Sequence, residues 1–329
     1  MKIKIAQFGL GPIGIETLKL AATKSWVEIV GGVDIDPQKI GKSLSEITGI
    51  PGLENKMVYA SFDELAKHEK PEVVLHTSVS RMKTALPQLE PIVKAGVSVV
   101  SSCEELLFPQ LKQPELAKQL DDLCKKHGAR VLGTGVNPGF VMDTLAVCLT
   151  GVCRSVEKIE VDRVVNASLR RGPLQKKIGS GLQPDEFRQL FREEKMGHVG
   201  LVESLALIAH ALNWKIGKIN ETCEPMIAKK FIQTEYIEVK ESLCCGIHHR
   251  AEATDGTKSI VLDLKMYLEA EDPRDAVRIT GDPSINAVLH GGVHGDRATV
   301  AALVNSAPNI LRAPAGLLLM TDIPVPRVG

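Results

Sequence analysis

The chain has 329 residues, 44% of them hydrophobic, with 40 basic side chains balancing 40 acidic ones. This length predicts two domains, because one domain usually needs about 100 to 200 residues. The balanced charge gives no electrostatic basis for binding nucleic acid or an anionic membrane. Apolar stretches such as residues 97–100 and 317–320 are far shorter than the ~20 residues that cross a bilayer. Because the first strand pattern starts at Lys2, no room is left for a signal peptide, and we expect a cytoplasmic protein.

The seven cysteines form no Cys-x-x-Cys pair, and an odd number cannot all pair within one chain, so we expect reduced thiols. Cys244 and Cys245, followed by His248 and His249, are residue types that zinc prefers. Neighbouring residues of a strand point to opposite faces of a sheet, so these side chains are not expected to converge on one ion. We predict no metal site.

Short runs rich in Val and Ile alternate with helical patterns in the first part of the chain. Strands are predicted at residues 3–8, 28–33, 73–76, 97–101 and 130–133, and helices at residues 13–24, 61–67, 82–95 and 114–127. This alternation is typical of a parallel sheet covered by helices. The fold class is therefore α/β, with an N-terminal doubly wound Rossmann domain over residues 1–137 that has at least five strands.

The pattern changes after the sequence Asn137-Pro138-Gly139. A helix at residues 141–149 and strands at 158–166, 236–238, 251–254 and 259–268 predict an α+β substrate and dimerisation domain over residues 138–295. The passage 169–181, rich in Gly and Lys, is expected to be a mobile loop. Helix 296–311 and an extended tail at 323–326 follow, and we expect segment 296–329 to pack back on the Rossmann domain.

A glycine-rich turn is the strongest chemical signal in the sequence. It directly follows the first strand, directly precedes a helix, and reads Gly9-Leu10-Gly11-Pro12-Ile13-Gly14. Such a turn binds the pyrophosphate of a dinucleotide: the first glycine makes the turn, the second admits the phosphates and the third lets helix and strand pack closely. We expect all six residues to contribute to cofactor binding.

Further cofactor contacts are expected beyond the ends of neighbouring strands. Asp34 ends the second strand, where a carboxylate accepts hydrogen bonds from the adenosine ribose and disfavours a 2′-phosphate. NAD(H) is therefore the predicted cofactor, but Lys39 and Lys42 lie close enough to leave NADP(H) open. The alternative for Asp34 is a turn-forming residue before Pro37. Ligands lie beyond the carboxyl ends of strands, so Thr77 and Ser78 should also touch the cofactor.

Glu104 and Glu105 follow the fourth strand, at the edge that faces the nicotinamide. A carboxylate here could hold an amine or shuttle its proton, and adjacent like charges push one pKa upward. The alternative is that the pair simply forms an acidic helix start.

Several motifs together resemble the 2,4-diaminopentanoate dehydrogenases and related native amine dehydrogenases, within the dihydrodipicolinate-reductase-like group. The resemblance extends over nearly the whole chain. It rests on Ser102-Cys103-Glu104-Glu105, Gly133-Thr134-Gly135-Val136-Asn137-Pro138-Gly139, the stretch 197–204 (Gly-His-Val-Gly-Leu-Val-Glu-Ser), Cys223-Glu224-Pro225 and Ile323-Pro324-Val325-Pro326. These spacings are far more specific than the glycine-rich turn alone.

The resemblance implies NAD(P)H-dependent interconversion of a small amine with a ketone and ammonia. By motif the catalytic carboxylate is Glu104 or Glu105, and we favour Glu105. Asn137, Gly139 and His198 match residues that line the domain junction, with Asn137 touching both cofactor and substrate. His198 would have a useful pKa for catalysis, although a single histidine also serves as a structural hydrogen-bonding group.

The sequence departs from the diaminopentanoate dehydrogenases in the stretch 165–174, where a substrate pocket is expected. Asn166, Arg170 and Arg171 are the predicted substrate contacts here, and Lys176 and Lys177 follow. These cations could clamp a carboxylate or phosphate, so we expect an anionic substrate other than diaminopentanoate.

Two alternatives to this function remain. One is an imine or carbonyl reductase of the same superfamily that uses no ammonia. The other is a dinucleotide-binding sensor without catalysis, since a fold alone does not establish chemistry. Substrate-domain sheets of the group pair across a two-fold axis, so a homodimer is expected.

Overall fold

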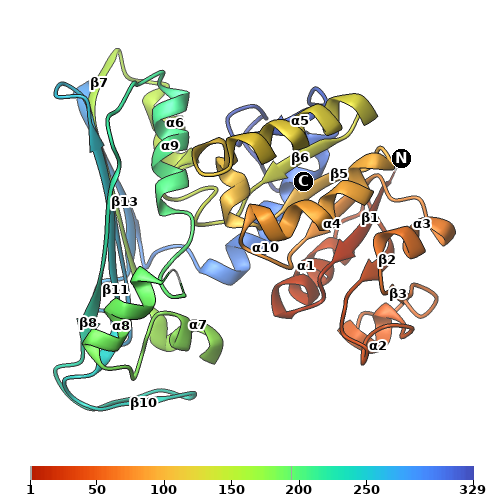
Figure 1. Ribbon diagram of the computed structural model, residues 1–329, viewed down its shortest axis with the longest axis horizontal. Helices are drawn as coiled ribbons and strands as arrows, with labels where there is room; N and C mark the ends of the chain where they lie inside the picture. Colours follow the sequence, from red (N-terminus) through yellow and green to blue (C-terminus); the bar gives the residue numbers. More distant parts are fainter. Residues whose placement is uncertain (1, 194) are drawn as a thin grey trace. The chain divides into compact units, whose positions relative to one another are not determined.

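The computed structural model describes residues 2–193 and 195–329. The chain divides into two compact units, one formed by Met1–Phe140 with His294–Gly329 and the other by Val141–Val293 (Figure 1). None of the helices that the structure describes has the length and apolar character needed to cross a membrane.

The first unit is built on a seven-stranded sheet in which every pair is parallel. Its strand order is β15 (Gly316–Leu318), β6 (Arg130–Gly133), β5 (Ser98–Ser101), β4 (Val73–His76), β1 (Ile3–Phe8), β2 (Val27–Val33) and β3 (Val58–Tyr59). The central strands are buried on both faces, which explains their uninterrupted Val/Ile-rich sequences. The predicted doubly wound Rossmann sheet is confirmed.

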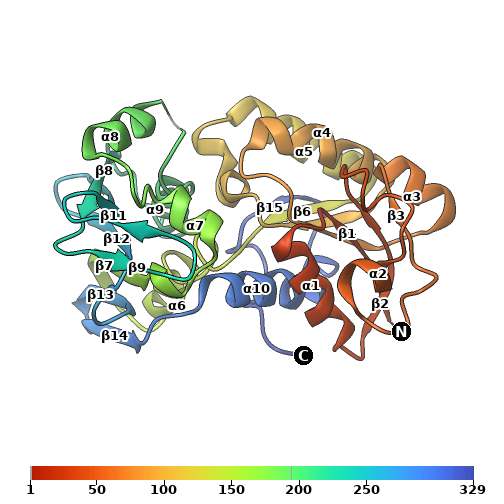
Figure 2. The same ribbon diagram turned by 90° about the horizontal axis from the view of Figure 1, so that it is seen from below.

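Helices flank this sheet. They are α1 (Pro12–Ala22), α2 (Leu44–Thr48), α3 (Phe62–His68), α4 (Met82–Lys94), α5 (Pro114–His127) and α10 (Gly295–Ile310), with the 3-10 turns η1 (Glu104–Leu107) and η2 (Pro109–Leu111). Helix α10 packs against α1, and β15 continues the sheet beside β6 (Figure 2). The C-terminal segment thus belongs to the first unit.

The order of the strands creates a point where the chain changes direction. It runs from β1 outward through β2 to β3, and then β4 returns to the opposite side of β1. Loops after β1 and β4 therefore leave the sheet in opposite directions, which opens the crevice where such sheets bind dinucleotides. The glycine-rich turn follows β1, and Thr77 and Ser78 follow β4.

The second unit contains a mixed six-stranded sheet, and the predicted α+β architecture is confirmed. Its order is β14 (Ile285–His290), β13 (Arg274–Asp282), β7 (Ser155–Asn166), β12 (Ser259–Tyr267), β11 (Cys244–Thr254) and β8 (Asn220–Ile227). Only β7 and β12 pair in parallel within the described sheet. A small hairpin pairs β9 (Ile232–Gln233) with β10 (Glu238–Val239), so the strand expected from residue 236 starts two residues later.

Helices α6 (Thr144–Thr150), α8 (Pro184–Arg192) and α9 (Leu201–Ala211) lie on the same side of this sheet (Figure 1). The prediction of a mobile loop at residues 169–181 is wrong, because the turn η3 (Ala167–Leu169) leads into helix α7 (Gly172–Lys177). Pro173 stands in the first turn of α7, where its fixed φ favours a helix, and Gln175 is fully buried. The charged sequence of this passage thus forms a short helix, and the buried glutamine anchors that helix.

Candidate active site

The three glycines of the turn after β1 meet three different steric demands. Gly9 has a φ of +88°, a conformation that L side chains rarely adopt. A Cβ atom on Gly14 would lie 1.9 Å from the carbonyl oxygen of Gly9, whereas a Cβ on Gly11 would meet no described atom within 4 Å. Gly14 is thus required by the turn itself, and Gly11 borders open space of the kind that a pyrophosphate needs.

The rest of the turn presents its backbone. Leu10 is fully buried, so its side chain anchors the turn in the core, while Pro12 is exposed and starts α1. Ile13 is half-buried. Among the described residues no side chain caps the first N–H groups of α1. These N–H groups and the helix dipole suit an anion.

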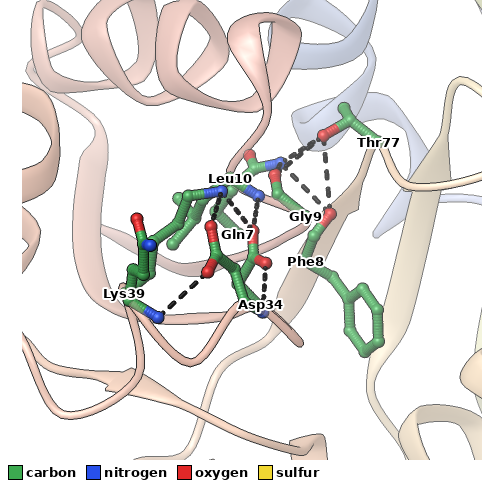
Figure 3. Close-up of polar contacts among 9 residues, drawn as sticks. Gln7, Phe8, Gly9, Leu10, Asp34, Lys39 and Thr77 are labelled. Carbon is green, nitrogen blue, oxygen red and sulfur yellow. Dashed lines mark hydrogen bonds and ion pairs between the residues drawn. The ribbon is translucent and has the colours of Figure 1, made fainter.

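The carboxylate of Asp34 is locked by its surroundings (Figure 3). Oδ2 accepts a hydrogen bond from the Leu10 backbone N–H at 2.7 Å and lies 3.4 Å from Nζ of Lys39. Oδ1 accepts from the backbone N–H of Asp36 at 2.9 Å, which is the turn-forming role considered as the alternative. Asp34 therefore couples the end of β2 to the glycine-rich turn, and its carboxylate has a fixed direction.

Thr77 and Ser78 are tied into different networks. The hydroxyl of Thr77 donates to the carbonyl of Gly9 at 3.0 Å and accepts from Nε2 of Gln7 at 2.8 Å, so it pins the glycine-rich turn (Figure 3). Ser78 is exposed, and its Oγ lies 2.5 Å from Oε1 of Gln88. Of the two residues, Ser78 is the one that presents a surface to a ligand.

The two glutamates after β5 differ in their surroundings. Glu105 is 4% exposed; its Oε2 accepts from the backbone N–H of Met82 at 2.7 Å, at the start of α4, and its Oε1 pairs with Arg81 at 3.0 Å. Glu104 is half-exposed at the beginning of η1. The buried carboxylate of Glu105 thus serves the N-terminus of α4, whereas Glu104 is the less buried of the two residues.

Asn137 and Gly139 follow β6. Both polar atoms of the Asn137 amide are buried and have no hydrogen-bond partner among the described residues. Burying an unpaired amide is costly, so this side chain has the properties of a ligand contact. Gly139 has a φ of +127°, and a Cβ there would lie 2.3 Å from the backbone nitrogen of Gly135. The turn itself therefore requires glycine at this position.

His198 lies in the second unit. Its Nε2 is buried and lacks a hydrogen-bond partner in the described part of the chain, and its ring meets that of His249 edge to face at 6.5 Å. Burial lowers the pKa of His198 well below its ordinary value, and His249, Lys177 and Arg163 lower it further. His198 is therefore neutral near pH 7 in surroundings that are electrostatically positive.

The other predicted substrate residues also belong to the second unit. Arg170 is buried, and Arg171 is half-buried at the start of α7. Oδ1 of Asn166 accepts from the backbone N–H of Ser168 at 3.0 Å, so Asn166 caps η3. Burial lowers the pKa of Arg163, and the charge of Arg170 adds to this effect. The two guanidinium groups are thus close enough to interact.

Gln175 was not identified from sequence. Its Nε2 donates to the carbonyl oxygens of Arg170 at 2.8 Å and Ser168 at 3.2 Å, and its Oε1 accepts from the hydroxyl of Thr234 at 2.8 Å. This fully buried side chain therefore links the backbone of Arg170 to the β9–β10 hairpin. Its partner is 59 residues away, so no local pattern could have indicated it.

The structure brings only part of the predicted set together. In the first unit the glycine-rich turn directly contacts Asp34 and Thr77. Glu104, Glu105 and Asn137 belong to the same unit, whereas the candidates of the second unit are Asn166, Arg170, Arg171 and His198. Cys244 and Cys245 are free and buried.

The parallel sheet, together with the residues of the dinucleotide-binding fingerprint, defines a Rossmann-type dehydrogenase. Residues 140–328 match the family of the 2,4-diaminopentanoate dehydrogenase C-terminal domain. The chain is 34% identical over 335 residues to the 2,4-diaminopentanoate dehydrogenase of Acetoanaerobium sticklandii, covering 99% of this chain and 94% of the relative. It belongs to the 2,4-diaminopentanoate dehydrogenase family, as its motifs predicted.

Two proteins named amine dehydrogenase are also similar. That of Streptomyces virginiae is 21% identical over 360 residues, covering 99% of this chain and 98% of its own. The solved amine dehydrogenase from Mycobacterium smegmatis superposes with a TM-score of 0.89 at 22% identity, covering 100% of this chain and 98% of that one. The second comparison confirms the fold along the whole chain.

Proposed function

We propose that this protein is an NAD(P)-dependent amine dehydrogenase that interconverts a small primary amine with a ketone and ammonia. The observation that carries the proposal is the position of Glu104, a half-exposed residue at the carboxyl edge of the same parallel sheet that carries the glycine-rich turn. The relatives named 2,4-diaminopentanoate dehydrogenase and amine dehydrogenase support this chemistry.

The first unit fits a nicotinamide dinucleotide. The open space beside Gly11 and the N-terminus of α1 suit the pyrophosphate, and Asp34 suits the adenosine ribose. The unpaired amide of Asn137 offers a donor and an acceptor, which fits a carboxamide. When bound, the nicotinamide accepts or supplies the hydride.

Glu104 is the carboxylate that we propose for catalysis, in place of Glu105. An amine is protonated near pH 7, so its nitrogen must first lose a proton. The lone pair that is freed can then form the C=N bond as the hydride leaves the carbon. An ionised carboxylate holds the ammonium group and accepts that proton as a general base. Glu105 is already engaged by Met82 and Arg81, so its role is to hold the turn.

The basic side chains of the second unit support recognition of an acidic group on the substrate. Arg163 and Arg170 interact electrostatically, and the positive surroundings of His198 include Lys177. Guanidinium groups bind carboxylates and phosphates well because their donors match these anions in geometry. We propose Arg170 and Arg171 for this contact, and His198 as a neutral hydrogen-bonding neighbour.

A homodimer and a cytoplasmic location complete the proposal. The strand residues on the side of the sheet away from α6 and α9 are charged and complementary: Arg274 pairs with Asp162 at 2.7 Å and Lys265 with Asp263 at 3.0 Å. A second copy could align such alternating charges about a two-fold axis, the commonest symmetry of soluble oligomers. Seven free cysteines suit a reducing compartment.

The test is oxidation of NADH and NADPH by the purified protein with small ketones and keto acids, each with and without ammonium. Turnover that needs ammonium is expected. Turnover that is independent of ammonium would establish the alternative, an imine or carbonyl reductase.

The carboxylate is tested by a matched pair of variants. Glu104→Gln should lower kcat by about 100-fold, because it removes a general base. Glu105→Gln should instead lower stability, since its amide keeps an acceptor for Met82 but loses the charge that pairs with Arg81. The reverse pattern would return catalysis to Glu105.

A further inference from the structure

A buried histidine lies between the glycine-rich turn after β1 and the turn after β5 that carries Glu104, the two parts of the proposed active site in the first unit. His76 is the last residue of β4 and is fully buried, and its ring packs against that of Phe8 with centroids 5.3 Å apart. Neither the cofactor fingerprint nor the proposed chemistry accounts for it. An apolar side chain could fill this space without the cost of burying a polar ring.

The hydrogen bonds of His76 define its tautomer. Nε2 lies 2.8 Å from Oε1 of Gln88, an atom that can only accept, so Nε2 carries the proton. Burial lowers the pKa of His76 to about 4, so the ring is neutral near pH 7. Nδ1 is therefore an acceptor, and the Ser101 hydroxyl, 2.8 Å away, donates to it.

This network continues in both directions. On one side, Oγ of Ser78 lies 2.8 Å from Nε2 of His76 and also donates to Gln88. On the other side, the Ser101 oxygen accepts the backbone N–H of Cys103 at 3.1 Å, the residue that precedes Glu104. The backbone N–H of Ser102 also donates to the carbonyl of His76 at 2.9 Å.

We propose that His76 is a positioning residue. Its ring fixes Ser101, and Ser101 holds the turn that carries Glu104 beside the cofactor-binding end of β4. The inference rests on the proposed function of Glu104. Ser101 can direct its hydroxyl proton to only one acceptor, and the Nδ1 atom of His76 fixes that direction. The lone pairs of Ser101 then point toward the backbone N–H of Cys103. In this way His76, which lies outside the turn, fixes the position of the start of η1.

Two substitutions separate the two sides of the ring. His76→Asn places a side-chain oxygen near the position of Nδ1 and keeps an acceptor for Ser101. His76→Gln places an amide near the position of Nε2 and keeps a donor for Gln88, but removes the acceptor for Ser101. Both variants lose the imidazole and its packing against Phe8, so each is the control for the other.

The measurements are kcat, the KM for NADH and the thermal unfolding temperature of both full-length variants. His76→Gln should lower kcat by about 30-fold with the KM for NADH within about twofold, because small displacements of a reacting group are costly. His76→Asn should retain most of the turnover, with a loss of about threefold. The unfolding temperatures should fall by similar amounts, since both variants leave similar space.

Equal losses of kcat in the two variants would overturn the inference and leave His76 as a packing residue. A raised KM for NADH with kcat preserved would also overturn it, because the ring would then act on the cofactor through Ser78. The Glu104→Gln variant separates this result from the proposed function. If Glu104→Gln loses turnover and His76→Gln does not, only the positioning role fails; if Glu104→Gln is fully active, the proposed function fails first.

Discussion

The two units hold their functional side chains in different ways. In the first unit, Asp34 and Glu105 accept hydrogen bonds from the backbone N–H groups of Leu10 and Met82. In the second unit, the buried groups are held by side chains that are far away in sequence: Arg163 pairs with Asp275, His249 with Glu221 and Gln175 with Thr234. The two carboxylates of the first unit thus take their direction from backbone N–H groups, whereas the buried arginine, histidine and glutamine of the second unit also depend on distant side chains.

The two kinds of partner differ in how they respond to a single substitution. A backbone donor survives substitution of its own side chain, so the cofactor turn depends mainly on steric freedom at its glycines. A side-chain partner is lost with one substitution, and a buried group left without its partner costs about 1–3 kcal/mol. The substrate region should therefore be the more easily altered by single substitutions.

The largest expected effect tests the steric basis of the cofactor turn. In Gly14→Ala, the new methyl group would lie 1.9 Å from the carbonyl oxygen of Gly9. We expect the free protein to lose about 3 kcal/mol or more of stability, together with most of its NADH binding. Thermal unfolding and NADH titration measure the two effects.

Gly11→Ala is the matched control, because its methyl group would enter open space. The free protein should keep its unfolding temperature and lose only affinity for the dinucleotide, since the pyrophosphate needs this space. A loss of stability in Gly11→Ala as large as that in Gly14→Ala would contradict the separate roles of the two glycines.

His76 is the exception in the first unit, because side chains hold it, and its titration should be visible in stability. The folded pKa is about 4 and the ordinary value 6.5, so only the unfolded chain takes up this proton as the pH falls between these values. Stability is unaffected above pH 6.5 and is lost as the pH falls to about 4, by up to about 3 kcal/mol from this residue.

Urea unfolding at pH 7 and pH 4.5 measures the effect. His76→Gln should be less sensitive to acid than the unaltered protein, because the buried base has been removed. His198 also has a lowered pKa, so part of the pH dependence should remain in the variant. An identical loss with and without His76 would show that the ring does not titrate with folding.

The cofactor turn could be predicted from sequence because its requirements are local. Glycines in a six-residue window, a strand before them and a helix after them already define the geometry, and Asp34 follows at the end of the next strand. The short elements α2, β3 and β15 were missed, since two to five residues carry too little periodicity to be recognised.

The remaining parts of the site depend on tertiary contacts. Glu104 and Glu105 are adjacent and chemically identical, and only the positions of Met82 and Arg81 show that Glu105 holds the start of α4. The role of His76 depends on Ser101, 25 residues further along the chain. Gln175 was hidden in a passage whose glycines and lysines indicated a loop, because burial of one glutamine has no signature in composition.

A smaller effect is expected at Thr234, and it tests how the second unit is held. Thr234→Val keeps the shape of the side chain but removes the hydroxyl that donates to Gln175. Gln175 can still donate to the carbonyl of Arg170, but its Oε1 loses its partner and the amide is held less firmly. The KM for an anionic substrate should therefore rise about tenfold, with little change for an uncharged one. Steady-state kinetics with a keto acid and the ketone of matching size show the difference.

Thr234→Ser keeps the hydroxyl and should restore the KM for the keto acid. A parallel rise for both substrates in Thr234→Val would mean that the hairpin supports the fold in general and not the recognition of charge. The proposed contact between Arg170 and an anionic group would then lose its support.

The smallest effect concerns the choice of cofactor. Nζ of Lys39 lies 3.4 Å from carboxylate oxygens of both Asp34 and Asp36 and partly offsets their charge. If Asp34 faces the adenosine ribose, as we propose, this cation would favour a 2′-phosphate. Lys39→Gln should raise the KM for NADPH about threefold and leave that for NADH nearly unchanged, because pairs of this exposure contribute little. Asp34→Ala should act in the opposite sense and weaken NADH more than NADPH.

The two variants together distinguish the roles of Asp34. If it only forms the turn with Asp36, Asp34→Ala should weaken both dinucleotides equally, since the turn geometry is common to them. If it also binds the ribose, the ratio of the two KM values should shift, and Lys39→Gln should shift it the other way. Opposite shifts at neighbouring side chains cannot come from a general loosening of the turn, because that would move both ratios together.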